Sequence, residues 1–134
     1  MSNLTQVVNT EKNMKTLKQG VHASDLDQLL SSTGPYTIFA PTDIAFEKLD
    51  TGTMSNLLHP DNKAKLTDLM NNHIVKGRYK YHDFKDGDIL TTLNGRTLEV
   101  EVKNGAVHIG KIQVLVREAK ISNGVMHVTD TVIV

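Results

Sequence analysis

The amino-acid sequence predicts a single α+β domain in which helices come first and an antiparallel β meander closes the chain. Hydrophobic residues recur with helical spacing in the first half, and after Asp88 they alternate with polar residues. Asn-Gly pairs at 94–95, 104–105 and 123–124 separate the strand-like runs, and this dipeptide is a strong hairpin signal. The chain has 134 residues, so we expect one domain over residues 1–134.

Three short helices are predicted ahead of residue 34. Apolar residues at helical spacing define their buried faces, and these are Leu4, Val7 and Val8, then Met14, Leu17 and Val21, then Leu26, Leu29 and Leu30. Ser24 precedes the third helix and Asp27 stands three residues later, so we expect Ser24 to be the N-cap of a capping box. Gly34 and Pro35 end this helix.

A short apolar strand is predicted at residues 36–40, and a capped helix follows it directly. Thr42 is the expected N-cap, and Asp43 lies in the first turn, where the helix dipole favours a carboxylate. Pro41 and Phe46 occupy the two positions of a hydrophobic staple. We expect Phe39 and Phe46 to be buried in the core.

The longest helix is predicted to open at His59 and to end at Gly77. Its apolar stripe contains one histidine, and the stripe consists of Leu66, Leu69, Met70, His73 and Ile74. A histidine on such a stripe is usually a core residue with both ring nitrogens hydrogen-bonded. We therefore expect His73 to be structural.

The composition excludes several functional classes. Lys and Arg number 15 and Asp and Glu number 15, so no net charge attracts nucleic acid or an anionic membrane. The absence of cysteine excludes disulfides, iron–sulfur clusters, thiolate zinc sites and a cysteine nucleophile. No signal-peptide pattern and no apolar window long enough to span a membrane is present, which leaves a cytoplasmic location as the alternative to export.

Three segments together resemble the fasciclin-type domain family. Residues 36–46 (YTIFAPTDIAF) resemble the first family signature, and residues 123–130 (NGVMHVTD) resemble the second. Between them, residues 72–77 (NHIVKG) stand where the family usually carries a Tyr-His pair and a short apolar run. The order and the spacing agree, and the resemblance covers nearly the whole chain.

The resemblance implies a wedge-shaped β-sandwich of about seven strands with the N-terminal helices packed against it. It implies a non-enzymatic module for protein interaction or cell adhesion, located outside the cell, in the periplasm or at the cell surface. We expect no cofactor, no nucleic-acid partner, no membrane insertion and a monomeric chain. The motif residues that the resemblance assigns a structural role are Phe39, Pro41, Thr42, Asp43, Phe46, Asn123, Gly124, His127 and Asp130.

The sequence also departs from the family pattern. Asn72 stands in place of the tyrosine before the histidine, and Lys76 in place of the common proline before the glycine. The Asp-Ile pair of integrin-binding animal members corresponds here to Glu118 and Ala119. Integrin recognition is therefore unsupported, and the partner stays open.

Residues 72–82 are the predicted contact surface. Tyr79 and Tyr81 lie two apart and face one side of an extended segment, while Arg78 and Lys80 share the other. We expect the tyrosines to be exposed, because paired aromatics and an arginine are typical anchors of protein interfaces. If the tyrosines are buried instead, the exposed side is a simple cationic edge formed by Arg78 and Lys80, which would bind little specifically. The candidate partner-binding residues are His73, Ile74, Val75, Arg78, Tyr79 and Tyr81.

The six histidines allow a second functional class. They are His22, His59, His73, His82, His108 and His127, and no two of them stand at a local metal-binding spacing, so we assign no metal ligand. His127 and Asp130 resemble two members of a catalytic triad, but no serine has the Gly-x-Ser-x-Gly frame, so we assign no catalytic residue. The alternative function is small-ligand binding or hydrolysis in a helix–sheet crevice near His73 and His127.

Overall fold

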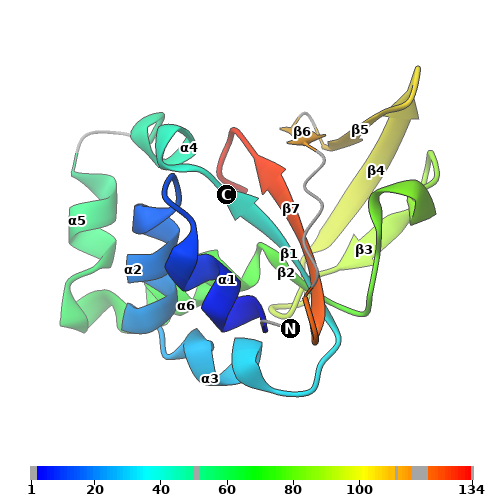
Figure 1. The fold of residues 1–134 in the computed structure, drawn as a ribbon. Coiled ribbons are helices and arrows are strands. Elements are labelled where there is room, and N and C mark those ends of the chain that lie inside the picture. The colour runs from blue at the N-terminus through cyan, green and yellow to red at the C-terminus, as the bar shows by residue number, and fades with distance from the viewer. Residues whose placement is uncertain (1–2, 50–51, 111, 116–120, 134) are drawn as a thin grey trace.

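A seven-stranded sheet with helices packed beside two of its strands forms the fold in a computed structural model that describes residues 3–49, 52–110, 112–115 and 121–133 (Figure 1). The strand order is β2-β1-β7-β6-β5-β4-β3. The strands are β1 (Tyr36–Pro41), β2 (Ile74–Lys76), β3 (Ile89–Thr91), β4 (Thr97–Lys103), β5 (Ala106–Ile109), β6 (Ile112–Leu115) and β7 (Gly124–Thr129).

The strands from β3 to β7 follow one another antiparallel, which confirms the predicted meander. β1 then pairs parallel with β7, and β2 pairs antiparallel with β1. The two ends of the sheet also meet, since Val75 of β2 forms a bridge with Thr92, just after β3. The Leu93 N–H donates to Ile74 O there (3.0 Å). The sheet is therefore nearly closed, and the predicted α+β, sandwich-like fold is confirmed.

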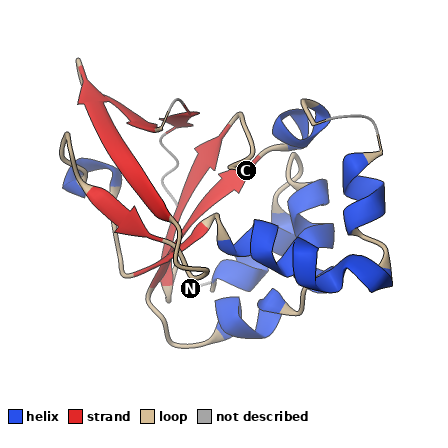
Figure 2. Cartoon of the chain, turned by 180° about the vertical axis from the view of Figure 1, so that it is seen from behind, coloured by secondary structure: helices blue, strands red, loops and turns tan. Residues whose placement is uncertain are grey.

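The helices gather on one side of the molecule (Figure 1). From behind, they lie beside β1 and β7, whereas β3 and β4 extend away from them (Figure 2). They are α1 (Leu4–Thr10), α2 (Lys15–Ala23), α3 (Leu26–Ser31), α4 (Asp43–Glu47), α5 (Thr53–Leu57) and α6 (Lys63–Asn71), with 3-10 turns η1 (Pro60–Asn62) and η2 (Tyr81–Asp83).

β1 and β7 serve two hydrophobic cores, because successive side chains of a strand point to opposite faces. Ile38 and Met126 face the helices and join the first core. Phe39 faces the inside of the sheet and joins the second core, together with Val100 and residues of the meander. Phe39 and Phe46 are both buried, as predicted.

The sequence predicts two N-caps, Ser24 and Thr42, and the structure confirms only the second. The Ala45 N–H donates to the Thr42 side chain at the start of α4, which confirms that cap. Ser24 does not cap α3, because its hydroxyl donates back to Gly20 O (2.7 Å) at the end of α2. Asp25, in a left-handed conformation, precedes α3 instead and makes no side-chain cap.

The helix predicted between His59 and Gly77 is shorter in the structure. This helical segment begins with η1 after His59 and continues as α6, which ends at Asn71 rather than at Gly77. Ile74 and Val75 belong to β2. A short apolar run fits either a helix or a strand, and here pairing with β1 decides the outcome.

The three Asn-Gly pairs also differ in outcome. Asn104 and Gly105 form the predicted tight turn between β4 and β5, with left-handed φ values of 52° and 81°. The pair at 94–95 lies in the connection between β3 and β4, as predicted. The pair at 123–124 is not a hairpin turn, because Gly124 begins β7 and pairs in parallel with Tyr36.

Candidate interaction site

Residues 76–84 form a continuous edge segment that leaves β2 and crosses the sheet towards β3. Its backbone is fixed at several points. The Gly77 N–H donates to Pro35 O (2.8 Å). The buried Thr37 hydroxyl donates to Gly77 O (2.8 Å) and accepts the Tyr79 N–H (3.0 Å). The edge segment is therefore held on β1 although it has little regular structure of its own.

The inner side of the edge segment belongs to an aromatic cluster. Tyr79 stacks on Phe84 with ring centroids 6.3 Å apart, and Phe84 lies 5.2 Å from the ring of His127. His127 also stacks on Phe39 (5.7 Å). The His127 Nε2–H donates to Tyr79 O (2.7 Å), which joins β7 to the edge segment. Burial lowers the pKa of His127, so the neutral ring is favoured.

The expected exposure of the two tyrosines is wrong. Tyr79 and Tyr81 are both half-buried and pack against the second core. The Tyr81 hydroxyl donates to Gly105 O (3.2 Å) and accepts the Val107 N–H (3.1 Å). The two side chains do turn to one side, but that side faces the aromatic cluster and the β4–β5 hairpin rather than solvent.

The exposed side chains of residues 76–80 are cationic, whereas Asp83 further along the edge segment is exposed and acidic. Lys76, Arg78 and Lys80 are exposed and alternate along the chain with Gly77 and the inward-facing Tyr79. The Arg78 guanidinium donates to Gly124 O (3.2 Å) and Ser122 O (3.3 Å). These bonds restrict the orientation of the Arg78 guanidinium.

Three of the predicted contact residues are buried. His73, Ile74 and Val75 are at most 2% exposed, so they do not reach a partner in this conformation. The His73 Nδ1–H donates to Leu69 O (2.9 Å), and Nε2 accepts the Ile133 N–H (2.9 Å). The prediction that His73 is a core histidine with satisfied nitrogens is confirmed.

Acid is expected to lower the free energy of unfolding through His73. Burial lowers its pKa from 6.5 to about 4 in the folded protein, so the unfolded chain takes up the proton first. The stability that neutral His73 contributes is complete above about pH 6.5 and is lost as the pH falls towards 4, by about 3 kcal/mol. Urea unfolding across this range measures the loss, and His73→Gln, which does not titrate, is the control. Equal pH slopes in both proteins would contradict the assignment.

One motif residue, Asn123, links distant parts of the fold through its side chain. Asn123 Oδ1 accepts the Leu4 N–H (2.9 Å), and Nδ2 donates to Leu30 O (2.6 Å) and Ser32 O (2.7 Å). Asn123 thereby joins α1 and α3 to the start of β7. The family resemblance assigns Asn123 a structural role, but the sequence did not indicate these partners, because the Asn-Gly pair signals a turn.

Two acidic motif residues have local roles. Asp43 Oδ1 accepts the Thr16 N–H (2.8 Å) in the first turn of α2, a helix that the sequence did not connect with it. Asp130 is exposed at the end of β7 and accepts a hydrogen bond from the Thr131 hydroxyl (3.3 Å), as a strand-end residue is expected to do.

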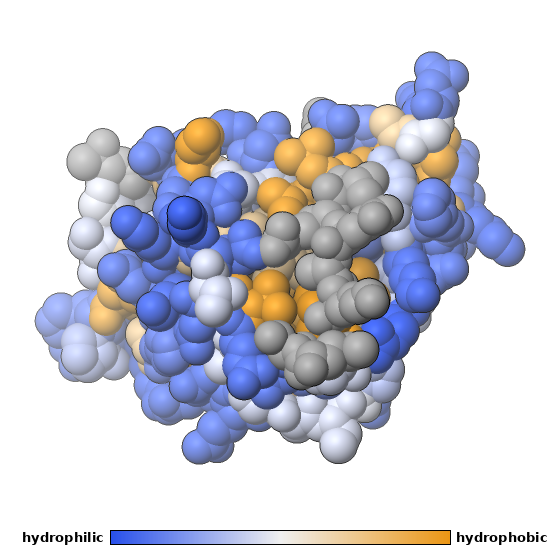
Figure 3. Space-filling model, viewed as in Figure 1, coloured by the Kyte–Doolittle hydropathy of each residue, from blue (hydrophilic) through white to orange (hydrophobic). Residues whose placement is uncertain are grey.

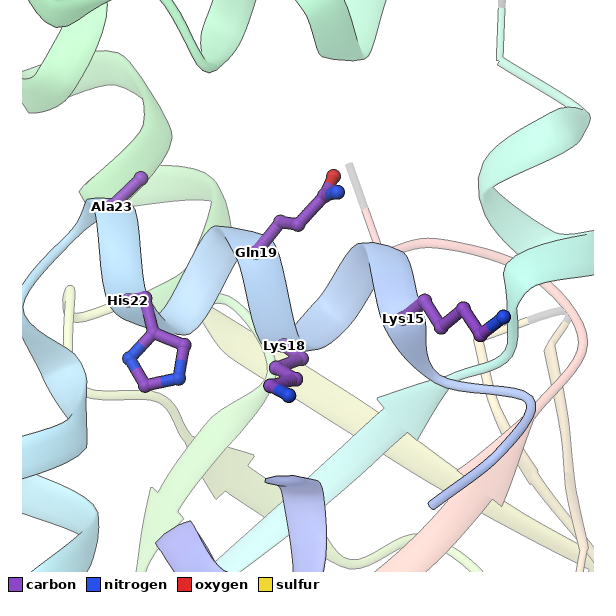
Figure 4. Close-up of a pocket in the computed structure, with 5 residues that line it drawn as sticks. All are labelled: Lys15, Lys18, Gln19, His22 and Ala23. Carbon is purple, nitrogen blue, oxygen red and sulfur yellow. The ribbon is translucent and has the colours of Figure 1, made fainter. Parts of the chain in front are cut away.

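The structure does not bring the groups of the alternative function together. His73 contacts Leu69 and Ile133, whereas His127 lies in the aromatic cluster. Within the described ranges, no three histidine or acidic side chains gather in a group that could hold a metal ion. An open depression lies along α2, lined by Lys15, Lys18, Gln19, His22 and Ala23. These side chains leave one helix in different directions and do not converge (Figure 4).

The surface of the helical half is mostly hydrophilic (Figure 3). In the same view, hydrophobic surface gathers near the middle of the molecule. Among the described residues, the large apolar side chains that are exposed are Ile44, Ile89 and Leu115. They belong to α4, β3 and β6. No helix in the described ranges has the length and hydropathy needed to cross a membrane.

Comparisons with known proteins agree with this architecture. The family model described as "Fasciclin domain" matches residues 12–134. Protein sll1483 of Synechocystis sp. is 38% identical over 130 residues, which cover 97% of this chain and 72% of that protein. Transforming growth factor-beta-induced protein ig-h3 of Sus scrofa is 35% identical over 134 residues, which cover 99% of this chain but only 19% of that protein.

A solved structure shows the same fold. It is a FAS1 domain pair from the insect cell adhesion molecule Fasciclin I, with a TM-score of 0.86 and 18% sequence identity. The match covers 99% of this chain and 51% of that chain. The present chain therefore corresponds in length to about one domain of the pair.

Proposed function

Because the chain belongs to the fasciclin domain family, we propose that it is a non-enzymatic protein-interaction module that acts in adhesion. The observation that carries the proposal is the outer side of the edge segment, where Lys76, Arg78 and Lys80 are presented on a backbone fixed to β1 and β7. The solved relative that shares this fold is part of a cell adhesion molecule, which supports the functional class. The same relationship supports a location outside the cell or at its surface.

The edge segment suits an acidic partner. A fixed backbone loses little conformational entropy on binding, so more of the contact energy appears as affinity. Arginine is enriched among the residues that dominate interfaces, and Arg78 is oriented by two backbone carbonyls. Of the candidate residues from the sequence, Arg78 remains the principal contact, while Tyr79 and Tyr81 support it from beneath. We propose that the chain acts as a monomer and binds acidic groups of a protein or cell surface.

Charge reversal tests the proposal. The triple variant Lys76→Glu, Arg78→Glu, Lys80→Glu is expected to raise, by at least about tenfold, the coating density at which suspended cells from the protein's own source attach. The matched control is Lys15→Glu, Lys18→Glu, Lys65→Glu, which makes the same change in net charge at exposed helix positions. The control is expected to support attachment like the unaltered protein.

Folding is checked separately by thermal melting of both triple variants. Equal attachment to the two triple variants, with unchanged melting, would show that the edge segment is not the contact surface. Attachment that is lost to the same extent in both would show a nonspecific charge effect and would likewise reject the assignment.

A further inference from the structure

The three Asn-Gly pairs occupy three different environments. Asn94 is held by Nδ2 bonds to Asp68 Oδ1 (3.1 Å) and Asn72 Oδ1 (2.6 Å). Asn123 is buried, and both polar atoms of its side chain are bonded. Asn104 is exposed at the tip of the β4–β5 hairpin, and its side chain bonds to no group in the described part of the chain. Of the three, only Asn104 has a free amide.

An Asn-Gly pair contains the reactants of a spontaneous cyclisation. The backbone nitrogen of the glycine attacks the side-chain carbonyl carbon of the asparagine, and the missing glycine side chain leaves that approach unshielded. The new bond joins Gly105 N to Asn104 Cγ, and the Cγ–Nδ2 bond breaks. The amide nitrogen leaves as ammonia and takes with it the proton lost by Gly105 N. Water then opens the cyclic imide at either carbonyl, which gives aspartate or isoaspartate.

The hairpin tip permits this cyclisation. Asn104 and Gly105 lie beyond the last ladder pair, Lys103 with Ala106, so the turn can change conformation without opening the sheet. A Cβ on Gly105 would meet no heavy atom within 4 Å outside its chain neighbours, so no other part of the described chain packs against this side of the turn. At the other two pairs the backbone is held, since Gly95 N–H donates to Thr92 O (3.0 Å) and Gly124 pairs with Tyr36.

We propose that Asn104 is a modification site at which the folded protein deamidates spontaneously, with water as the co-reactant, to aspartate and isoaspartate. The reaction has a structural consequence because Gly105 O accepts the Tyr81 hydroxyl (3.2 Å). Isoaspartate lengthens the main chain of the turn by one carbon and adds a carboxylate. It therefore displaces Gly105 O from Tyr81 and loosens the support of the edge segment. This inference does not depend on the proposed function.

The test is an incubation of the purified full chain in warm, mildly alkaline buffer. Peptide mass mapping follows the conversion of amide to acid at each Asn-Gly pair, and isoaspartyl methyltransferase labels the isoaspartate. In the folded protein we expect Asn104 to convert at least about tenfold faster than Asn94 and Asn123, which must first open locally. In concentrated urea the three rates are expected to become similar.

The variant Asn104→Gly keeps the left-handed turn and removes the amide, and it is expected to prevent labelling of the β4–β5 hairpin peptide in the native protein. Equal native rates at the three pairs, or persistent labelling of the hairpin peptide in this variant, would overturn the modification site. The consequence is tested by comparing the isoaspartyl form, purified by ion exchange, with Asn104→Asp, which has the same charge but a normal backbone. A lower melting temperature of the isoaspartyl form is expected. Equal melting would overturn the loss of the Tyr81 contact.

Discussion

Gly124→Ala is expected to prevent stable folding. A Cβ at this position would lie 2.0 Å from Tyr36 O and 2.8 Å from Leu4 Cδ1. The carbonyl belongs to the backbone of β1, which six residue pairs tie to β7, so it cannot move aside without breaking the parallel pairing. We expect a loss of at least about 5 kcal/mol, most of the stability of an ordinary domain. Far-UV circular dichroism and urea unfolding measure the effect.

Gly20→Ala is the matched control for this substitution. Its Cβ would meet Met70 Sδ at 2.8 Å, but this atom is part of a flexible side chain. The gain in helix propensity of about 1 kcal/mol offsets part of the displacement. We therefore expect Gly20→Ala to fold. A folded Gly124→Ala protein with nearly unchanged stability would refute the close approach of β7 and β1.

Asn123→Ala is expected to destabilise the protein by about 3–5 kcal/mol. The substitution removes three hydrogen bonds and leaves the Leu4 N–H and the carbonyls of Leu30 and Ser32 without their partner. The effect is large because Asn123 is buried, and water does not readily replace the lost groups. Denaturant unfolding gives the change in free energy.

Asn13→Ala provides the comparison, because Asn13 is exposed and, among the described residues, its backbone carbonyl accepts the Asp43 N–H (2.8 Å) while its side chain forms no hydrogen bond. Its stability is expected to stay within about 0.5 kcal/mol of the unaltered chain. If both variants lost the same small amount, Asn123 would not be the link between α1, α3 and β7.

Local patterns predicted those parts of the fold that local interactions determine. The alternation of Leu98, Val100 and Val102 correctly indicates β4, and Thr42 is recognisable as a cap from the residues next to it. Pairing between segments that are distant in the sequence cannot be recognised from such local patterns. β1 and β7 are about 80 residues apart in the sequence, and nothing in either strand states that they pair in parallel. The partners of Asn123 were missed for the same reason, because they lie 91 to 119 residues away in the sequence.

In the candidate site, the sequence predicts that the two tyrosines share one side, but it does not predict which side is buried. The spacing of Tyr79 and Tyr81 correctly places both side chains on one side of the edge segment. Which side is buried depends on Phe84 at the end of the segment and on Phe39 and His127, which come from β1 and β7. Once these rings cover the inner side, the cations are left to face solvent. The family resemblance suggested the segment, and the packing decides which of its side chains are exposed.

The central place of β7 affects how the protein can be made. β7 is the last strand in the sequence, yet it lies between β1 and β6 and joins the helical half to the meander. While the chain is still on the ribosome, β1 lacks its parallel neighbour, and the apolar faces of β1 and of the N-terminal helices stay incompletely covered. Pairing across so long a separation slows folding and prolongs the time for which apolar surface is open to aggregation. We therefore expect the chain to complete its fold only after residues 124–129 have left the ribosome.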